Sequence, residues 1–384
     1  MNMHRETMTP EERTWAAIRL EKPDRVPVVP LLSPEPAAHL AGGITMAQVS
    51  TDSQVASRAF FKVFDEFGGW DSVITYPETP IQLQAVNGIP MKMRIPGKDL
   101  PEDYIYQLME EPVLKPEDYS KICEMGIDKF YYDDYIWRIT DLKPLDISRA
   151  IDELQSTWKR FRIELKKKGV KALFVASELH PFFRLSLMRS MVSFTQDLYY
   201  NPEPVEKTLK RLTAELIPKQ IDIAKRSGMK TCFFTDERGS AFFYPPSVFE
   251  RFWWPYTQEI VDAFWSEGIV TIFHLDQCWN KNLPYFRKLP KGSAVLCFDS
   301  TTDIFLAKEV LRGHLCLLGD VSASLLSLGK PQDVEAYCKK LIDEVGGDGG
   351  FILGSGCSVA AHCRPENFRA LIETGKNYEL SNRG

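Results

Sequence analysis

Eight short apolar runs alternate with helix-like segments along the chain, and this alternation restricts the possible folds more than any other feature. Each run is rich in β-branched and aromatic residues, and most end in a polar residue or a turn. Nearly continuous apolar strands that alternate with helices indicate a parallel sheet covered on both faces. Eight such units predict an α/β fold, a closed (β/α)8 TIM barrel. The runs are RVPVVPLL, DSVITYP, ALFVASE, CFFTDE, TIFHLD, AVLCFD, HLCLLGD and GFILGSGC, which begin at residues 25, 71, 172, 232, 271, 294, 314 and 350.

The segments between these runs favour helices, and several open with proline near the first turn, where a missing N–H costs nothing. The expected helices include residues 204–227, 246–267, 331–345 and 365–378. Residues 86–146 are too long for one connection between a strand and a helix, and they contain the hairpin-like NGIPMKMRIPGKD. We therefore predict one barrel domain over residues 1–384, with an inserted subdomain or lid after the second strand at about 86–146.

The charge and hydropathy of the chain exclude several classes of partner. A net charge of −5 provides no basic face for nucleic acid or an anionic membrane. The densest basic stretch, residues 159–169, lies over an apolar stripe at helical spacing and indicates a solvated helix face. No run of about 18 apolar residues and no signal-peptide core occur, so we expect a cytoplasmic protein with reduced cysteines. Four scattered cysteines are then expected to be small buried residues: Cys123, Cys232, Cys297 and Cys338.

Polar residues stand where six of the eight runs end. In a barrel of parallel strands, all these ends meet at one face, where active sites are built. The convergence of these side chains, more than any one of them, predicts a functional site. The residues are Glu178, His180, Asp236, Glu237, His274, Asp276, Asp299, Asp320 and Cys357.

Three of these residues have the chemistry of a zinc site. Strand alternation sends His274 and Asp276 to the same side, and Cys357 follows the eighth run. Imidazole, carboxylate and thiolate all bind zinc, which in catalytic sites keeps a fourth position open for substrate. Glu237, from the neighbouring strand, is a further ligand candidate or a partner that orients the histidine.

The spacing of these residues leaves alternatives open. His274 and Asp276 could instead bond to neighbouring strand ends while Cys357 packs. Cys278 could replace Asp276 as a ligand, and either His362 or Cys363 could replace Cys357. Cys316 falls within a strand and is expected to fill the barrel.

Asp236 and Glu237 are candidate catalytic residues at the end of the fourth run. Adjacent strand residues point to opposite faces, so only one of them can point into the barrel. We expect Glu237 to lie near the metal and Asp236 to hold the following loop.

Long segments of the chain resemble the uroporphyrinogen decarboxylase superfamily, and within it the cobalamin-dependent methyltransferase branch. The resemblance spans nearly the whole chain and implies a (β/α)8 barrel. It is carried by EERTWAAIRLEKPDRVPVVP, TDERGSAFFYPPSVFERFWWPY, FHLDQCWNKNLPYFRKLP, LLGDVSASLLSLGKPQDVEAYCKKLID and GGFILGSGCSVAAHCRPENFRALIETGKNY.

The resemblance separates two chemistries. True decarboxylases place an arginine-rich segment after the first strand to hold a polyacidic substrate, whereas this chain has LLSPEPAAHLAGGI, without arginine. The methyltransferase branch implies zinc bound by an H-x-C pair and a Gly-Cys. This chain matches at His274 and Cys357 but has Asp276 where cysteine is expected. A carboxylate donates less charge than a thiolate and leaves the ion a stronger Lewis acid, suited to polarising oxygen.

These features predict a zinc-dependent methyltransferase that moves a methyl group from an oxygen-bound donor, such as a methoxylated aromatic, to reduced cobalt. The corrinoid would be supplied by a partner protein, because the D-x-H-x-x-G signature of cobalamin domains does not occur in this sequence. The alternatives are transfer from a methyl-corrinoid to a small thiol, a metal-free decarboxylase and a non-catalytic adaptor barrel. The sequence does not indicate the oligomeric state.

Overall fold

Eight parallel strand segments form a ring in the computed structural model, which describes residues 6–74 and 80–378. Six of them hydrogen-bond side by side in the order β10-β9-β8-β7-β6-β5, and β1 pairs in parallel with β4. The eight predicted runs supply these segments, and the predicted (β/α)8 barrel is confirmed. In chain order the segments are residues 26–31, β1 (Ser72–Val73), β4 (Lys171–Ala172) with β5 (Ala176–Leu179), β6 (Thr231–Asp236), β7 (Val270–Leu275), β8 (Ala294–Phe298), β9 (Cys316–Val321) and β10 (Phe351–Ser355).

The first run closes the ring although it makes only isolated bridges. Val28 pairs with Leu353 of β10, and the Val28 carbonyl accepts a bond of 2.9 Å from the Asp71 N–H on its other side. Pro27 and Pro30 have no N–H to donate, so a continuous ladder cannot form here.

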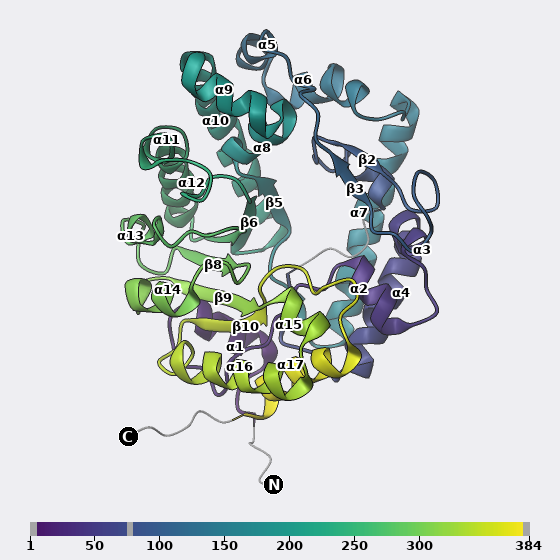
Figure 1. Ribbon diagram of the computed structural model, residues 1–384, viewed down its shortest axis with the longest axis vertical. Helices are drawn as coiled ribbons and strands as arrows, with labels where there is room; N and C mark the ends of the chain where they lie inside the picture. Colours follow the sequence, from purple (N-terminus) through teal and green to yellow (C-terminus); the bar gives the residue numbers. More distant parts are fainter. Residues whose placement is uncertain (1–5, 75–79, 379–384) are drawn as a thin grey trace.

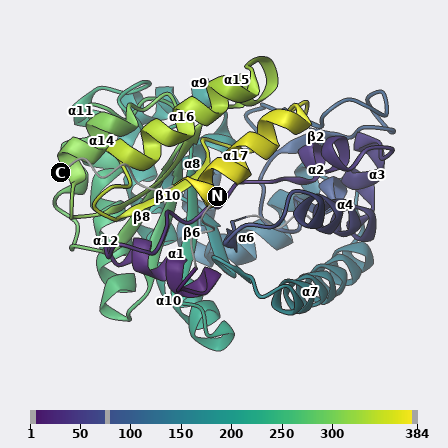
Figure 2. The same cartoon turned by 90° about the horizontal axis from the view of Figure 1, so that it is seen from below.

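Helices connect the strands on the outside of the ring, and Figure 2 shows α10, α14, α16 and α17 around β6, β8 and β10. The helix predicted over 246–267 is two helices, because Pro255 cannot donate to the preceding turn. The helices of the barrel are α1 (Pro10–Ile18), α2 (Pro34–Ala41), α3 (Met46–Thr51), α4 (Ser53–Glu66), α7 (Pro144–Lys167), α8 (Pro181–Arg189), α9 (Met191–Tyr200), α10 (Pro202–Ser227), α11 (Pro246–Phe252), α12 (Trp254–Ser266), α13 (Leu283–Phe286), α14 (Ile304–Leu311), α15 (Ala323–Leu328), α16 (Pro331–Glu344) and α17 (Pro365–Asn377).

The segment between β1 and β4 contains an antiparallel hairpin of β2 (Lys92–Arg94) and β3 (Gln107–Met109), which lies beside α3 (Figure 1). Glu110, just after β3, accepts bonds of 3.0 and 2.8 Å from the guanidinium of Arg238, which follows β6. The hairpin is thereby tied to the carboxyl end of the barrel. The described part of the segment also contains η1 (Ile81–Leu83), α5 (Asp118–Met125), α6 (Ile127–Asp133) and η2 (Tyr135–Arg138), and it ends with α7. The division into one domain with an insertion at 86–146 stays a prediction.

Two apolar clusters show which strand residues face inward. The inner cluster contains alternate strand residues such as Phe233, Val270 and Ile272, while their neighbours Phe234 and Phe273 belong to the outer cluster under the helices. Ala17 and Ile18 of α1 join the inner cluster, so this helix packs against the barrel interior. Inward-facing residues nearer the carboxyl ends of the strands line the open end of the barrel, which we call the mouth.

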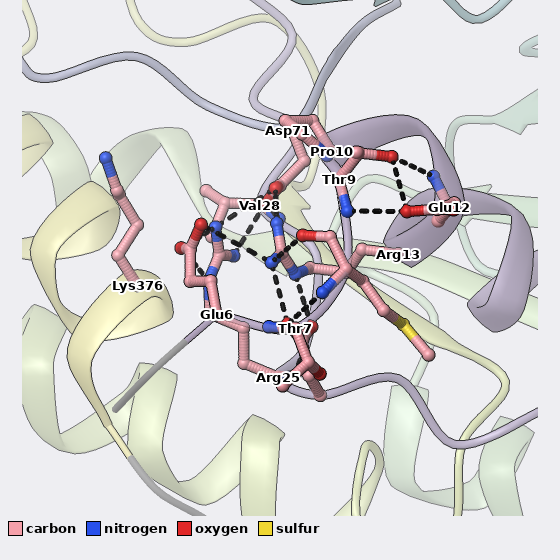
Figure 3. Close-up of polar contacts among 12 residues, drawn as sticks. Glu6, Thr7, Thr9, Pro10, Glu12, Arg13, Arg25, Val28, Asp71 and Lys376 are labelled. Atoms are coloured by element: carbon pink, nitrogen blue, oxygen red, sulfur yellow. Dashed lines mark hydrogen bonds and ion pairs between the residues drawn. The ribbon is translucent and has the colours of Figure 1, made fainter. Parts of the chain in front are cut away.

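A buried ion cluster fastens α1 to the first two strands (Figure 3). The fully buried Arg13 guanidinium lies 2.6 Å from both Asp24 and Asp71. Asp71 also accepts bonds from Arg25 and from the Val28 N–H, at 2.7 and 2.8 Å. One carboxylate therefore joins the helix, the first run and β1.

Other expectations from composition can be compared with the structure. Leu154, Phe161 and Leu165 of α7 are buried beneath the basic run, which is a helix face as predicted. All eight cysteines are free thiols, and Cys123 is half-buried instead of buried. Across the described ranges, no helix combines the length and the apolar character that a membrane crossing requires.

Candidate metal centre at the barrel mouth

β7 and the loop after β10 bring His274, Asp276 and Cys357 together. Val270 and Ile272 face inward on β7, and the same alternation carries His274 and Asp276 to the mouth. Nε2 of His274 lies 3.1 Å from Oδ1 of Asp276 and 3.5 Å from Sγ of Cys357. Sγ of Cys357 lies 3.6 Å from Oδ2 of Asp276. Three ligand atoms of different chemistry thus surround one point.

These separations fit a tetrahedral zinc ion. With bonds of about 2.0–2.1 Å to nitrogen and oxygen and about 2.3 Å to sulfur, tetrahedral geometry requires edges of about 3.3 Å and about 3.6 Å. The two separations from Nε2, 3.1 Å to Oδ1 and 3.5 Å to Sγ, are close to these lengths. The 3.6 Å separation joins Sγ to the second carboxylate oxygen, Oδ2, and one ligand atom from each residue lies within 4.8 Å of the other two. In addition, the buried Oδ1 of Asp276 has no hydrogen-bond partner of suitable geometry, although Nε2 is near. A cation would satisfy this orphaned oxygen.

Without a metal, the contacts of His274 favour its protonated form. Burial lowers the pKa of His274, but its contacts with Asp276, Cys297 and Cys357 outweigh this effect and raise the pKa well above the ordinary value. A metal ion would have to displace this proton from Nε2, so its binding is expected to weaken in acid.

Cys297 of β8 contacts the opposite nitrogen of the same ring. Its Sγ lies 3.5 Å from Nδ1 of His274. Burial raises the pKa of the Cys297 thiol. Contacts of this kind fix the orientation of a ligating imidazole. Cys297 is fully buried in the inner apolar cluster, as expected, and in addition contacts the ring. The role of Glu237 as a further ligand or as a partner that orients the histidine stays a prediction.

The alternative ligands lie outside the cluster. Within residues 6–74 and 80–378, His274, Asp276 and Cys357 are the one group of three whose ligand atoms converge within 4.8 Å. Cys363 is buried in the outer apolar cluster, and the His362 ring packs edge to face on His39 at 5.5 Å. Cys278 is half-buried and does not join the group.

Asp236 is turned away from the mouth and organises the loop after β6. Its Oδ1 accepts bonds of 2.8 Å from the N–H groups of Arg238 and Gly239, and its Oδ2 accepts one from the Trp253 indole. A Cβ at Gly239 would lie 2.3 Å from the Trp253 ring, so only glycine permits this close approach. The carboxylate has the loop-holding position that we expected for it.

Glu237 directly follows β6, and Phe233 and Thr235, which alternate with it along the chain, line the mouth cavity. Its side chain is exposed to solvent. Desolvation by the surrounding protein, followed by the charge of Asp276, raises the pKa of Glu237 to about 7. The side chain can therefore hold or release a proton near neutral pH.

The other polar residues at the strand ends make structural contacts. Glu178 pairs with Arg184 of α8, and His180 bonds to Thr257 of α12 at 3.0 Å. Oδ2 of Asp299 accepts the Gln277 N–H at 2.9 Å, and Oδ1 of Asp320 accepts the Tyr337 hydroxyl at 2.7 Å. The expectation that all nine strand-end residues share one site was therefore too broad.

A cavity of about 340 Å³ opens beside the metal cluster, and His274 and Cys357 form part of its wall. Glu35 of α2 and Tyr106 of the hairpin also line it, although the sequence analysis singled out neither. The lone glutamate after the first strand was a signal for Glu35. No local pattern marks Tyr106.

The buried Asp236 carboxyl should leave a signature in the pH dependence of stability. Burial raises its pKa to about 6, whereas an aspartate in an unfolded chain titrates near 3.9. The folded protein holds this proton more tightly than the unfolded chain does. The resulting stabilisation of the folded state is therefore complete below pH ~4 and is lost as the pH rises to ~6. We expect Asp236→Asn to remove up to about 3 kcal/mol of this dependence. Urea unfolding between pH 4 and 7 measures the unfolding free energy of both proteins. If this free energy changes with pH identically in the wild type and the variant, the pH dependence does not come from Asp236.

The parallel barrel and the His, Asp and Cys cluster at its mouth define an α/β-barrel protein with a candidate metal centre. The sequence model of the family described as Uroporphyrinogen decarboxylase (URO-D) matches residues 130–378. The chain belongs to the uroporphyrinogen decarboxylase family.

Individual relatives are more distant. The chain is similar to proteins named methylcobamide:CoM methyltransferase MtbA, with 26% identity over 152 residues in Methanosarcina mazei and 24% over 153 residues in Methanosarcina acetivorans. It is also 26% identical over 180 residues to a uroporphyrinogen decarboxylase of Geotalea daltonii. These matches cover 40, 40 and 46% of this chain, and 43, 43 and 50% of the relatives. The chain thus spans half the length, or less, of the curated relatives it matches.

A solved structure supports the fold over nearly the full chain. A methyltransferase from Methanosarcina mazei superposes with a TM-score of 0.70 at 18% identity, over 96% of this chain and 98% of the other. At this identity, the similarity establishes the barrel architecture.

Proposed function

We propose that this protein transfers a methyl group from an oxygen-bound donor, such as a methoxylated aromatic, to the reduced cobalt of a corrinoid held by a separate protein. The observation that carries the proposal is the meeting of His274 Nε2, the Asp276 carboxylate and Cys357 Sγ beside an open cavity, with contacts of 3.1 Å to Oδ1, 3.6 Å to Oδ2 and 3.5 Å between Nε2 and Sγ. The relatives named methylcobamide:CoM methyltransferase support a corrinoid as the reaction partner, whichever way the methyl group moves.

The ligand set favours a donor in which oxygen leaves. His274, Asp276 and Cys357 would hold zinc, with Cys297 orienting the imidazole. When bound, zinc would supply Lewis acidity at the donor oxygen and lower the barrier to loss of a poor leaving group. Asp276 in place of a second thiolate keeps that acidity high, because a carboxylate donates less charge.

Glu237 completes the proposed chemistry by handling a proton. In the reaction, the bond from methyl carbon to oxygen breaks and its electron pair stays on the oxygen, while the cobalt electron pair forms the new bond to carbon. The Glu237 carboxyl, with its pKa raised to about 7, can donate its proton to the departing oxygen.

Transfer from a methyl-corrinoid to a thiol is the second candidate, because the two similar proteins from Methanosarcina carry that activity in their names. An omission assay separates the two. We expect demethylated product only when the protein, a methoxylated donor and reduced cobalamin are all present. If the protein instead methylates a thiol from methylcobalamin and releases no product from any methoxylated donor, the proposed direction is wrong.

A further inference from the structure

The carboxyl end of β8 supplies none of the three ligands of the metal cluster, yet it contacts the segments that carry all of them. It lies between β7, which leads to His274 and Asp276, and β9, whose other neighbour β10 leads to Cys357. The side chains concerned are Cys297, the penultimate residue of the strand, and Asp299, which follows its last residue.

Cys297 contacts two of the ligand segments. It pairs with His274 across the ladder between β7 and β8, and its Sγ lies 3.5 Å from Nδ1. When Nε2 is free to bind a metal, Nδ1 of the neutral ring carries the proton, and the sulfur can accept it. The thiol can in turn donate to the carbonyl of Gly356, 4.0 Å away in the residue before Cys357. One fully buried thiol therefore lies between the histidine and the loop of the third ligand.

Asp299 holds the turn that follows Asp276. Its Oδ2 accepts the N–H of Gln277 at 2.9 Å, while its Oδ1 accepts the N–H and the hydroxyl of Thr301 at 2.9 and 2.6 Å. Gln277 has a φ of 69°, a left-handed conformation that is uncommon for a residue with a Cβ. The bond from Asp299 stabilises this conformation, and with it the path of the chain directly after Asp276.

Close packing of two backbones places the loop that carries Cys357. A Cβ at Gly356 would lie 2.8 Å from the carbonyl carbon of Asp299 and 3.1 Å from the nitrogen of Ser300, so only glycine permits this approach. The Gly356 N–H also donates to the Val321 carbonyl at 3.0 Å. The peptide before Cys357 is therefore held against the ends of β8 and β9.

We propose that Cys297 and Asp299 are positioning residues of the metal centre, and that the end of β8 is a template that orders the three ligands before the ion binds. The template rests on the proposed function for the presence of the metal, and it adds residues that set metal affinity and ligand geometry without binding the ion. Removal of such partners typically weakens metal binding about 10- to 100-fold.

Metal affinity, measured by competition with a chelator, tests the template without requiring methyl transfer. We expect Cys297→Ala and Asp299→Ala each to raise the dissociation constant for zinc about tenfold or more. Cys297→Ser and Asp299→Asn keep an acceptor and should recover part of the affinity, whereas Cys297→Val fills the space without a polar atom and should not. Two controls should bind zinc like the wild type: Cys316→Ala, in the inner apolar cluster, and Asp303→Ala, at the N-cap of α14.

Cobalt(II) ions in place of zinc give a second readout, which a loss of fold stability alone would not change. The visible absorption of a tetrahedral Co(II) site with a thiolate ligand depends on the arrangement of its ligands. At Co(II) concentrations that saturate the site, we expect the bands of Cys297→Ala and Asp299→Ala to shift or weaken. The Cys316→Ala and Asp303→Ala controls should keep the wild-type spectrum.

The outcomes separate the template from the proposed function. Wild-type zinc affinity and Co(II) spectrum in Cys297→Ala or Asp299→Ala would remove that residue from the template, and in both would overturn it. Equal losses in the two controls, or no metal binding by the wild-type protein, would also overturn it. Methyl transfer from a methoxylated donor would still support the proposed function. Weakened metal binding in the variants, without methyl transfer by the wild type, would leave the template standing and count against the function.

Discussion

Replacing His274 or Cys357 with alanine should reduce bound zinc from about one ion per chain to roughly a tenth or less, because either change leaves only two protein ligands. Their ligand atoms lie 3.5 Å apart and come from β7 and from the loop after β10, so each provides a separate ligand. Elemental analysis of protein purified without chelator measures the zinc content per chain. Methyl transfer should fall with the metal.

Matched variants make this result specific. His362→Ala and Cys363→Ser change the same residue types at positions outside the cluster, and both should retain the metal. Circular dichroism controls for folding, because His274 is buried. Full zinc content in both His274→Ala and Cys357→Ala, or its loss in the two controls, would remove the proposed centre.

Asp71→Ala should cost the protein about 3–5 kcal/mol of unfolding free energy, because it leaves the buried Arg13 and the nearly buried Arg25 without the carboxylate between them. The same change removes the acceptor of the Val28 N–H, which helps to close the ring. Figure 3 shows these groups converging on the one side chain. Urea unfolding followed by fluorescence measures the difference.

A surface pair provides the comparison. Asp222 forms an ion pair with Arg226 one turn away, with side chains 60 and 71% exposed, so Asp222→Ala should cost about 0.5 kcal/mol or less. Asp71→Asn keeps the shape of the side chain and serves if the alanine variant does not fold. A cost below about 1 kcal/mol for both Asp71 variants would show that the cluster does not secure α1.

The sequence predicts the barrel well because its evidence is local. Each strand is marked by its own apolar run, and eight runs leave few ways to bury them. The first run forms bridges in place of a strand because Pro27 and Pro30 interrupt its donors, which the sequence already contains. His274, Asp276 and Cys357 could be placed at one end from strand alternation alone.

The errors concern contacts that local patterns do not specify. A cysteine within a buried strand looks the same whether it fills space or contacts a ring nitrogen, as Cys297 does. Ser177 faces the cavity, so its neighbour Glu178 turns to the helices and pairs with Arg184. Tyr106 reaches the mouth only because the hairpin packs over it, and that packing depends on residues distant in sequence.

The absorbance of cobalt tests the central claim most directly, because methyl transfer changes the state of the corrinoid itself. Reduced cobalamin would be mixed with an equimolar amount of the protein and, in turn, with each member of a panel of methoxylated aromatic donors. The His274→Ala variant is the control. We predict that the reduced spectrum is replaced by that of methylcobalamin with the wild-type protein, and that the variant leaves it unchanged. An unchanged spectrum with wild-type protein across the panel, beside rapid methylation of a thiol by methylcobalamin, would contradict the proposed reaction.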